Sequence, residues 1–97
     1  MREGDRTIND VLKAVAAHFE MSRGELVSGR VPRRARLFAR YLACRVTRLS
    51  FPQIGARTGG VTGTNVVFAL RTIENYMAKD AVFAAEVEGI KASLLLK

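Results

Sequence analysis

Apolar residues recur along this chain every three to four positions, and no segment alternates apolar and polar residues as a half-buried strand does. The first apolar stripe consists of Ile8, Val11, Leu12, Val15 and Phe19. Thr7, followed three residues later by Asp10, is a short capping box that opens this first predicted helix. Ser22 and Glu25 repeat the capping pattern, so we expect a second helix of a single turn that ends near Val27.

A third helix is predicted at about residues 32–48, with one apolar and one basic face. Pro32 suits its first position, where the missing N–H has no helical partner in any case. The positions expected in the core are Ala35, Phe38, Ala39, Leu42, Val46 and Leu49. The other side carries Arg33, Arg36 and Arg40 at i, i+3 and i+7, flanked by Arg34, Arg45 and Arg48. Guanidinium groups in such a row suit the spacing of backbone phosphates.

Ser50 opens a short fourth helix, with Gln53 completing a capping box and Pro52 in the first turn. We expect this helix to stop at residues 58–60, where two glycines supply the positive φ of a C-cap and turn. The fifth helix is predicted from near Thr62 to about Lys79. Its expected buried positions are Val66, Ala69, Leu70, Ile73 and Met77.

Asp80 caps a last predicted helix, whose apolar positions are Phe83, Val87, Ile90 and Leu94. The pattern therefore predicts an all-α fold, a compact helical domain of about five to six helices. A short helix, a glycine-containing turn and a longer helix are typical of a helix-turn-helix, whose second helix lies in the major groove of DNA. A plain corner between two helices is the alternative interpretation.

Composition narrows the possible classes of protein. At 97 residues, 48% apolar and 26% charged, the chain is assigned to a single domain, residues 1–97, with its core at 7–95. No apolar run approaches a membrane span, the first residues contain no signal-like segment, and Cys44 has no second cysteine to pair with. We therefore expect a cytoplasmic protein with no membrane partner. Because His18 is the only histidine and is expected at the surface, we expect no enzyme activity, metal or cofactor.

The positive charge is concentrated in one stretch. The net charge is +7, and residues 30–48 contain seven arginines and no acidic residue. Such a block is often only a solvated helix face. Uncompensated like charges repel one another, however, so we expect an anionic partner, of which nucleic acid is the commonest.

Three stretches of this chain, "TINDVLKAVAAHFEMSRGELVS", "LFARYLACRVTRLSFPQIG" and "GGVTGTNVVFALRTIE", resemble the C-terminal DNA-binding domain of the bacterial chromosomal replication initiators, the DnaA family. The resemblance extends over about residues 7–94. Its most specific parts are "LSFPQIG" and the glycine pair that follows. It implies a Trp-repressor-like or DnaA domain IV-like helix-turn-helix that binds double-stranded DNA.

The chain departs from that family where the family reads bases. After its glycine pair the family has arginine, aspartate, histidine, threonine, threonine and valine. This chain has Val61, Thr62, Gly63, Thr64, Asn65 and Val66. By the resemblance, Arg30 is the counterpart of a minor-groove arginine, Arg34 and Arg36 match basic positions, and Cys44 replaces a lysine. No phosphate-binding loop is present, so we expect no nucleotide partner and no ATP-driven origin melting.

The candidate contacts follow from both arguments. The base-reading candidates are Thr62, Thr64, Asn65, Phe68 and Arg71. The phosphate or minor-groove candidates are Arg30, Arg33, Arg34, Arg36, Arg40, Ser50 and Gln53. Asn65 suits adenine, Arg71 suits guanine or a phosphate, and Phe68 suits a thymine methyl group, although Phe68 could instead cover a loop or a dimer partner.

Two functions are compatible with these residues. The first is double-stranded DNA binding, sequence-specific or weakly specific, that regulates replication initiation or transcription. The second is a protein-interaction module in which the reading helix is a docking surface. The pattern leaves open whether the protein is a monomer or a weak homodimer. For Cys44, both a plain half-buried thiol and a thiolate stabilised by arginines are considered.

Overall fold

The computed structural model describes residues 7–28 and 33–95, and every regular element in these two segments is an α-helix. In chain order the helices are α1 (Ile8–His18), α2 (Arg23–Ser28), α3 (Arg33–Val46), α4 (Phe51–Arg57), α5 (Gly63–Lys79) and α6 (Ala81–Leu95). The predicted all-α fold is therefore confirmed. In the described part of the chain, no helix combines the length and the apolar character that crossing a membrane requires.

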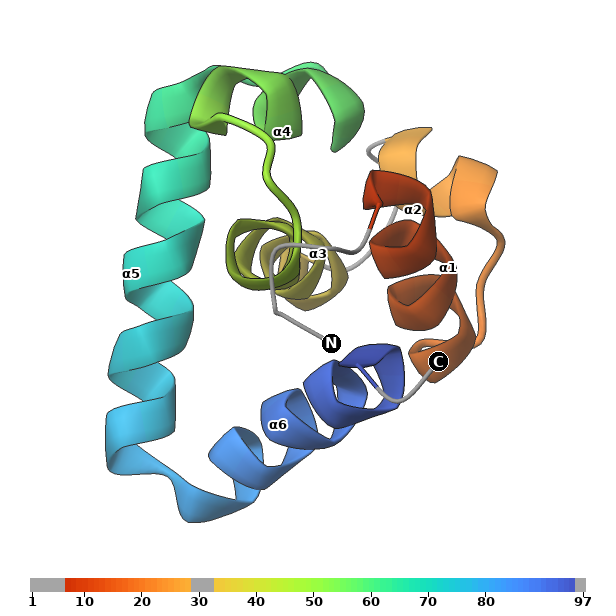
Figure 1. The fold of residues 1–97 in the computed structure, drawn as a ribbon. Helices are drawn as coiled ribbons and strands as arrows, with labels where there is room; N and C mark the ends of the chain where they lie inside the picture. Colours follow the sequence, from red (N-terminus) through yellow and green to blue (C-terminus); the bar gives the residue numbers. More distant parts are fainter. Residues whose placement is uncertain (1–6, 29–32, 96–97) are drawn as a thin grey trace.

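Helix α3 is the centre of the fold. Figure 1 looks nearly along its axis, with α5 on one side, α1 and α2 on the other, and α4 and α6 closing the two remaining sides. All five of these helices contact α3. This position explains why its predicted apolar stripe is so fully buried: Phe38, Leu42 and Val46 have no exposed surface.

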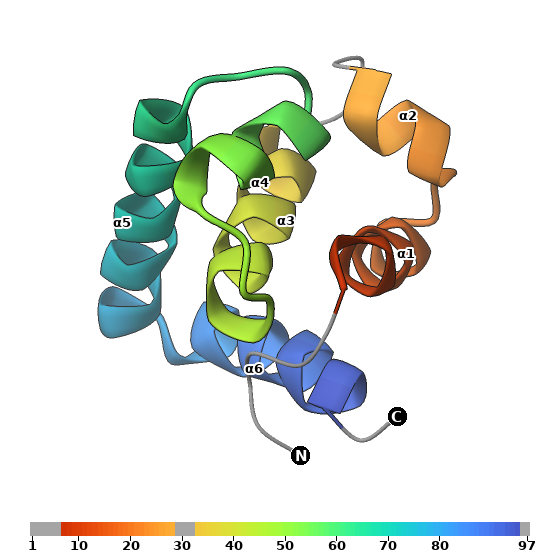
Figure 2. The ribbon, with the colours of Figure 1, turned by 45° about the horizontal axis from the view of Figure 1, so that its top comes forward.

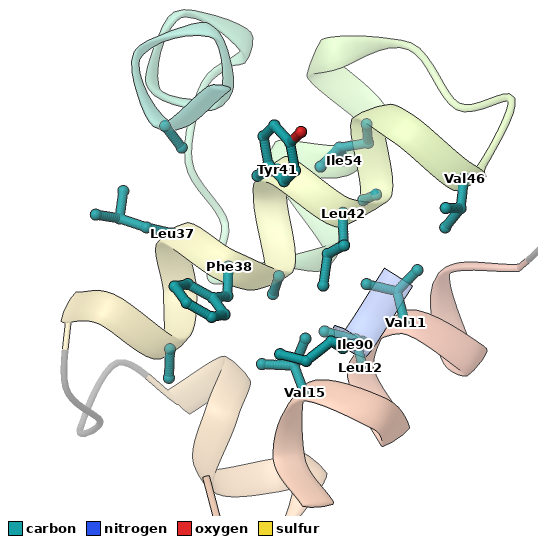
Figure 3. Close-up of a cluster of buried hydrophobic side chains, with 14 of the residues drawn as sticks. Val11, Leu12, Val15, Leu37, Phe38, Tyr41, Leu42, Val46, Ile54 and Ile90 are labelled. Carbon is teal, nitrogen blue, oxygen red and sulfur yellow. The ribbon is translucent and has the colours of Figure 1, made fainter. Parts of the chain in front are cut away.

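The core joins α3 to its neighbours across the whole molecule. In Figure 3 the side chains of Val11 and Val15 from α1 point toward Leu42 of α3, with Ile90 of α6 beside them and Ile54 of α4 on the other side of Leu42. Each fully buried aliphatic side chain of this kind stabilises the fold by about 1.5–3 kcal/mol. The apolar positions predicted from periodicity are confirmed as core or core-lining residues, with Phe19, Leu49, Leu70, Met77 and Phe83 only partly buried.

Helix α3 ends two residues earlier than predicted, at Val46 rather than Arg48. The Thr47 hydroxyl donates to the carbonyl of Ala43 at 2.6 Å and accepts the N–H of Leu49 at 3.3 Å. A threonine side chain that bonds the backbone on both sides offers the chain an alternative to the next helical turn. Leu49 therefore lies beyond the helix.

The capping residues predicted from sequence make the expected bonds. Thr7 and Asp10 form a reciprocal capping box on α1, and Ser50 and Gln53 form another on α4. Ser22 and Glu25 do the same for α2, and Asp80 Oδ1 accepts the N–H groups of Val82 and Phe83 at the start of α6. The backbone and side-chain hydrogen bonds from Ser22 lower the pKa of the Glu25 carboxyl below its ordinary value. Pro32, predicted to open α3, lies outside the described residues.

The turn between α4 and α5 is closed by glycines. Gly59 and Gly60 have φ angles of 112° and 70°, which side chains rarely adopt, so the predicted glycine turn is confirmed. Gly55 is buried in α4, where an added Cβ would lie 2.3 Å from the carbonyl oxygen of Val61. The carbonyl of Gly55 also accepts the N–H of Val61 at 3.0 Å. Figure 2 shows the result: α4 and α5 lie side by side against α3, and the turn joins them at one end.

Candidate nucleic-acid interface

The first two turns of α3 and of α5 border a small surface hollow of about 210 Å³. It is lined by Arg33, Arg36, Leu37, Arg40, Val61, Asn65 and Phe68. Three arginines of one helix thus face the same hollow as two candidate reading residues of the other. None of these described lining residues is acidic.

Of the three arginines that line the hollow, Arg33 is the exposed one. Its guanidinium carbon lies 5.6 Å from the ring centroid of Phe68, within the range of a cation–π contact. Phe68 itself is 55% exposed, so the contact joins two surface residues from α3 and α5. Sequence reasoning missed this pair because the two positions are 35 residues apart and neither has a local signal for the other.

Arg40 is not the exposed phosphate ligand that the helical spacing predicts. Only 8% of the residue is accessible. Its guanidinium donates from Nη2 to the carbonyl of Thr58 at 2.8 Å and from Nε to Thr58 Oγ1 at 3.3 Å. A Cβ added at Gly59 would lie 3.4 Å from Nη2 of the same guanidinium, so the backbone of this glycine passes close to Arg40. Arg40 therefore holds the C-terminal end of α4, because α4 covers the part of α3 that sequence periodicity assigns to solvent.

Arg36 is intermediate in exposure between Arg33 and Arg40. It is partly buried, and its Nε is buried with no hydrogen-bond partner among the described residues. Its positive charge also acts on Arg40, whose pKa is lowered below the ordinary arginine value first by burial and then by Arg36. Like charges gathered around one hollow repel, and an anion placed there would relieve the repulsion.

Arg34 is half exposed and also has partners within the fold. Its guanidinium forms an ion pair with Glu86 of α6 and lies 5.3 Å and 5.4 Å from the rings of Phe38 and Phe83. The second oxygen of Glu86 bonds His18 Nε2 of α1 at 2.6 Å. Arg34 therefore turns toward α6, and Glu86 links it to α1; its predicted role as a phosphate ligand stays a prediction.

The reading candidates lie on the exposed side of α5. Thr64, Asn65, Phe68 and Arg71 are all exposed, as their positions opposite the buried stripe predict. Thr62 is the exposed N-cap residue of α5, and its side chain makes no capping hydrogen bond. All the base-reading candidates are thus accessible near the first half of the helix.

Two further phosphate candidates, Ser50 and Gln53, form the capping box of α4. The N–H of Ser50 donates to Gln53 Oε1 at 2.8 Å, and the N–H of Gln53 donates to Ser50 Oγ at 3.3 Å. Both residues are exposed while capping α4. Arg30, the expected minor-groove residue, lies outside the described residues.

Cys44 is a half-buried residue of α3, and His18 is an exposed residue of α1. Burial raises the pKa of the Cys44 thiol to about 11, so the alternative of a thiolate stabilised by neighbouring arginines is wrong and the half-buried thiol is confirmed. His18 is an exposed residue, as predicted, and its ring packs edge-on against Phe19. Within residues 7–28 and 33–95, no three metal-ligating side chains come together.

A short helix, a tight glycine turn and a second helix with an exposed, arginine-flanked start define a helix-turn-helix domain. The model of the bacterial DnaA protein helix-turn-helix family matches residues 8–73. The chain therefore belongs to the DnaA helix-turn-helix family, and the matched region is not the ATPase module of those proteins.

Individual relatives agree with the family match. The chain is 44% identical over 87 residues to the chromosomal replication initiator protein DnaA of Agrobacterium fabrum, which covers 87% of this chain and 18% of that protein. It is 38% identical over 91 residues to the DnaA of Sphingopyxis alaskensis, covering 91% of this chain and 20% of the relative. It is 41% identical over 90 residues to the DnaA of Rhodopseudomonas palustris, covering 90% of this chain and 19% of the relative. The chain thus spans about a fifth of the length of these initiators.

Proposed function

We propose that this chain binds double-stranded DNA, with the start of α5 in the major groove and arginines of α3 on the neighbouring backbone phosphates. The observation that carries the proposal is the shared hollow, which Arg33 and Arg36 of α3 line together with Asn65 of α5. One duplex can therefore meet the base-reading side chains and the phosphate-binding groups at the same time. The net charge of +7 favours the same partner.

The sequence preference differs from that of the initiators in this proposal. The family's arginine, aspartate and histidine are replaced here by Val61, Thr62 and Gly63. Each lost bidentate contact removes about 1–3 kcal/mol of discrimination between base pairs. We therefore propose a small cytoplasmic DNA-binding domain, residues 1–97, that prefers another site or has weak preference. Because the matched relatives are replication initiators, the regulated process is proposed to be replication initiation or, alternatively, transcription.

The experiment is a salt titration of binding to a fluorescent duplex of random sequence. Each phosphate neutralised by an arginine changes the slope of log Kobs against log salt by about −0.9, which is roughly a 3.5-fold loss of affinity between 50 and 200 mM salt. Arg33→Ala and Arg36→Ala should each flatten the slope by about one phosphate. Lys13→Ala is the matched control, because Lys13 is an exposed cation on α1, on the side of α3 away from α5 (Figure 1).

Two outcomes would contradict DNA binding. One is a dissociation constant weaker than about 10 µM at 50 mM salt, since even non-specific binders reach about 10⁻⁴–10⁻⁶ M at higher salt. The other is an equal effect of Arg33→Ala and Lys13→Ala on the slope, which would indicate a diffuse charge effect in place of this interface.

A protein-interaction module is the second candidate, and the exposed ring of Phe68 is the observation that favours it. Val61 and Val67 are partly buried, so each adds less apolar surface to a patch around Phe68 than an exposed residue would. The docking function predicts that Phe68→Ala releases a bound protein and leaves affinity for duplex DNA and its salt slope unchanged. We favour DNA because the same face carries the arginines.

A further inference from the structure

Phe68 is unusual for a residue of the reading helix. More than half of its surface is exposed, and among the described residues its ring is not part of the hydrophobic core cluster. Asn65 precedes it by three positions and Thr64 by four, so all three side chains lie on one face of α5. Both of those residues are also exposed. The ring therefore lies where a groove-bound helix meets base edges.

The contact with Arg33 restricts this ring without covering it. The guanidinium approaches the ring at 5.6 Å, and Asn65 lines the same hollow. A ring supported by a cation loses less rotational freedom when it binds a ligand than a free one does. The same guanidinium remains exposed and available to a phosphate next to the base that the ring contacts.

The chemistry of this face limits which bases it can read. Guanine is usually read by arginine or lysine, and cytosine by a carboxylate. From Val61 to Leu70 the chain has no charged side chain. The first two turns of α5 therefore offer an amide, which suits adenine, and an apolar ring, which suits the 5-methyl group of thymine, whereas Arg71, the first cation on this face, lies three residues beyond the ring.

We infer that Phe68 is a thymine-reading residue, whose ring packs on the 5-methyl group in the major groove while Arg33 supports it and binds a flanking phosphate. The inference rests on the proposed DNA binding and specifies its substrate class, duplexes rich in A·T pairs. Phe68 is then a specificity-determining residue, and Arg33 a positioning residue for it.

Replacing thymine by uracil tests this directly, because it removes only the methyl group from the major groove and keeps the base pair. Affinity is measured by fluorescence anisotropy for a short alternating dA–dT duplex and for its dA–dU equivalent. Burying one methyl group is worth about a fourfold change in affinity, so the wild-type protein should bind the thymine duplex at least about fourfold more tightly. Phe68→Ala should bring this ratio close to one.

Tyr76→Ala is the matched control, since Tyr76 is also an aromatic residue of α5 and is also 55% exposed. It lies about two turns further along the helix and should keep the thymine-to-uracil ratio. Arg33→Gln should weaken binding to both duplexes and reduce the ratio. Far-ultraviolet circular dichroism confirms that each exposed-site variant is folded.

The outcomes separate this inference from the proposed function. Equal affinity of the wild-type protein for the two duplexes would overturn thymine reading and leave DNA binding standing. A ratio that persists in Phe68→Ala would show that another residue reads the methyl group and would overturn the role of Phe68. Failure to bind either duplex would overturn both proposals.

Discussion

Substituting Gly55 by alanine tests the geometry that holds the two helices of the helix-turn-helix together. The new Cβ would lie 2.3 Å from the carbonyl oxygen of Val61 and 3.0 Å from that of Thr62. Both obstacles are backbone atoms, so the turn must shift and the Val61-to-Gly55 hydrogen bond is disturbed. Overpacking of this kind costs about 1–3 kcal/mol, and a disturbed hydrogen bond about 1 kcal/mol more. The higher helix propensity of alanine returns about 1 kcal/mol.

The expected net loss for Gly55→Ala is therefore about 1–3 kcal/mol, which for a domain of this size lowers Tm by roughly 5–20 °C. Thermal unfolding followed at 222 nm measures it. Gly89→Ala is the matched control: Gly89 is also helical, but nothing lies within 4 Å of an added Cβ. That variant should gain about 1 kcal/mol and melt several degrees higher. If both variants raise Tm, α4 does not approach the turn as closely as the structure indicates and the reasoning is wrong.

Two further predictions concern α3. Arg40→Met should lower the free energy of unfolding by about 1–3 kcal/mol, because the buried Thr58 carbonyl loses its donor. The control Arg33→Met should change the free energy of unfolding by less than about 0.5 kcal/mol, because Arg33 is exposed. Urea unfolding measures both, and equal effects would contradict the burial of Arg40. Because the pKa of Cys44 is raised from 9.0 to about 11, its thiolate population at pH 8 should be about a hundredfold lower in the folded than in the unfolded protein. Iodoacetamide should then alkylate the native thiol about a hundredfold more slowly, and similar rates in the two states would refute the shift.

Several features of the protein follow from its sequence alone. The capping pairs led by Thr7, Ser22 and Ser50 form as predicted, and so does the positive-φ turn at residues 59–60. These features depend on residues within four positions of one another, so the local chain contains all the information. The apolar stripes are equally readable, because helical periodicity determines which residues share a face before anything packs on that face.

The roles of the arginines could not be read from the sequence. Arg33, Arg34 and Arg40 have the same side chain and belong to one basic helix, yet one contacts Phe68, one pairs with Glu86 and one is buried against Thr58. Periodicity indicates which side of α3 they occupy, but not which helix covers that side. Even the end of α3 depended on a side chain that bonds the backbone in place of another helical turn.

The sequence by itself therefore determined the helices, their capped starts, the glycine turn and the net positive charge, because these follow from local spacing and composition. Only the tertiary structure decided which partner each arginine of α3 has and which arginine is buried. The reason is physical: Glu86 comes 52 residues after Arg34 and Thr58 comes 18 after Arg40, so their meeting depends on how α4 and α6 pack around α3. The same packing brings Arg33 and Phe68 together on the surface, where both stay exposed beside the other reading candidates of α5.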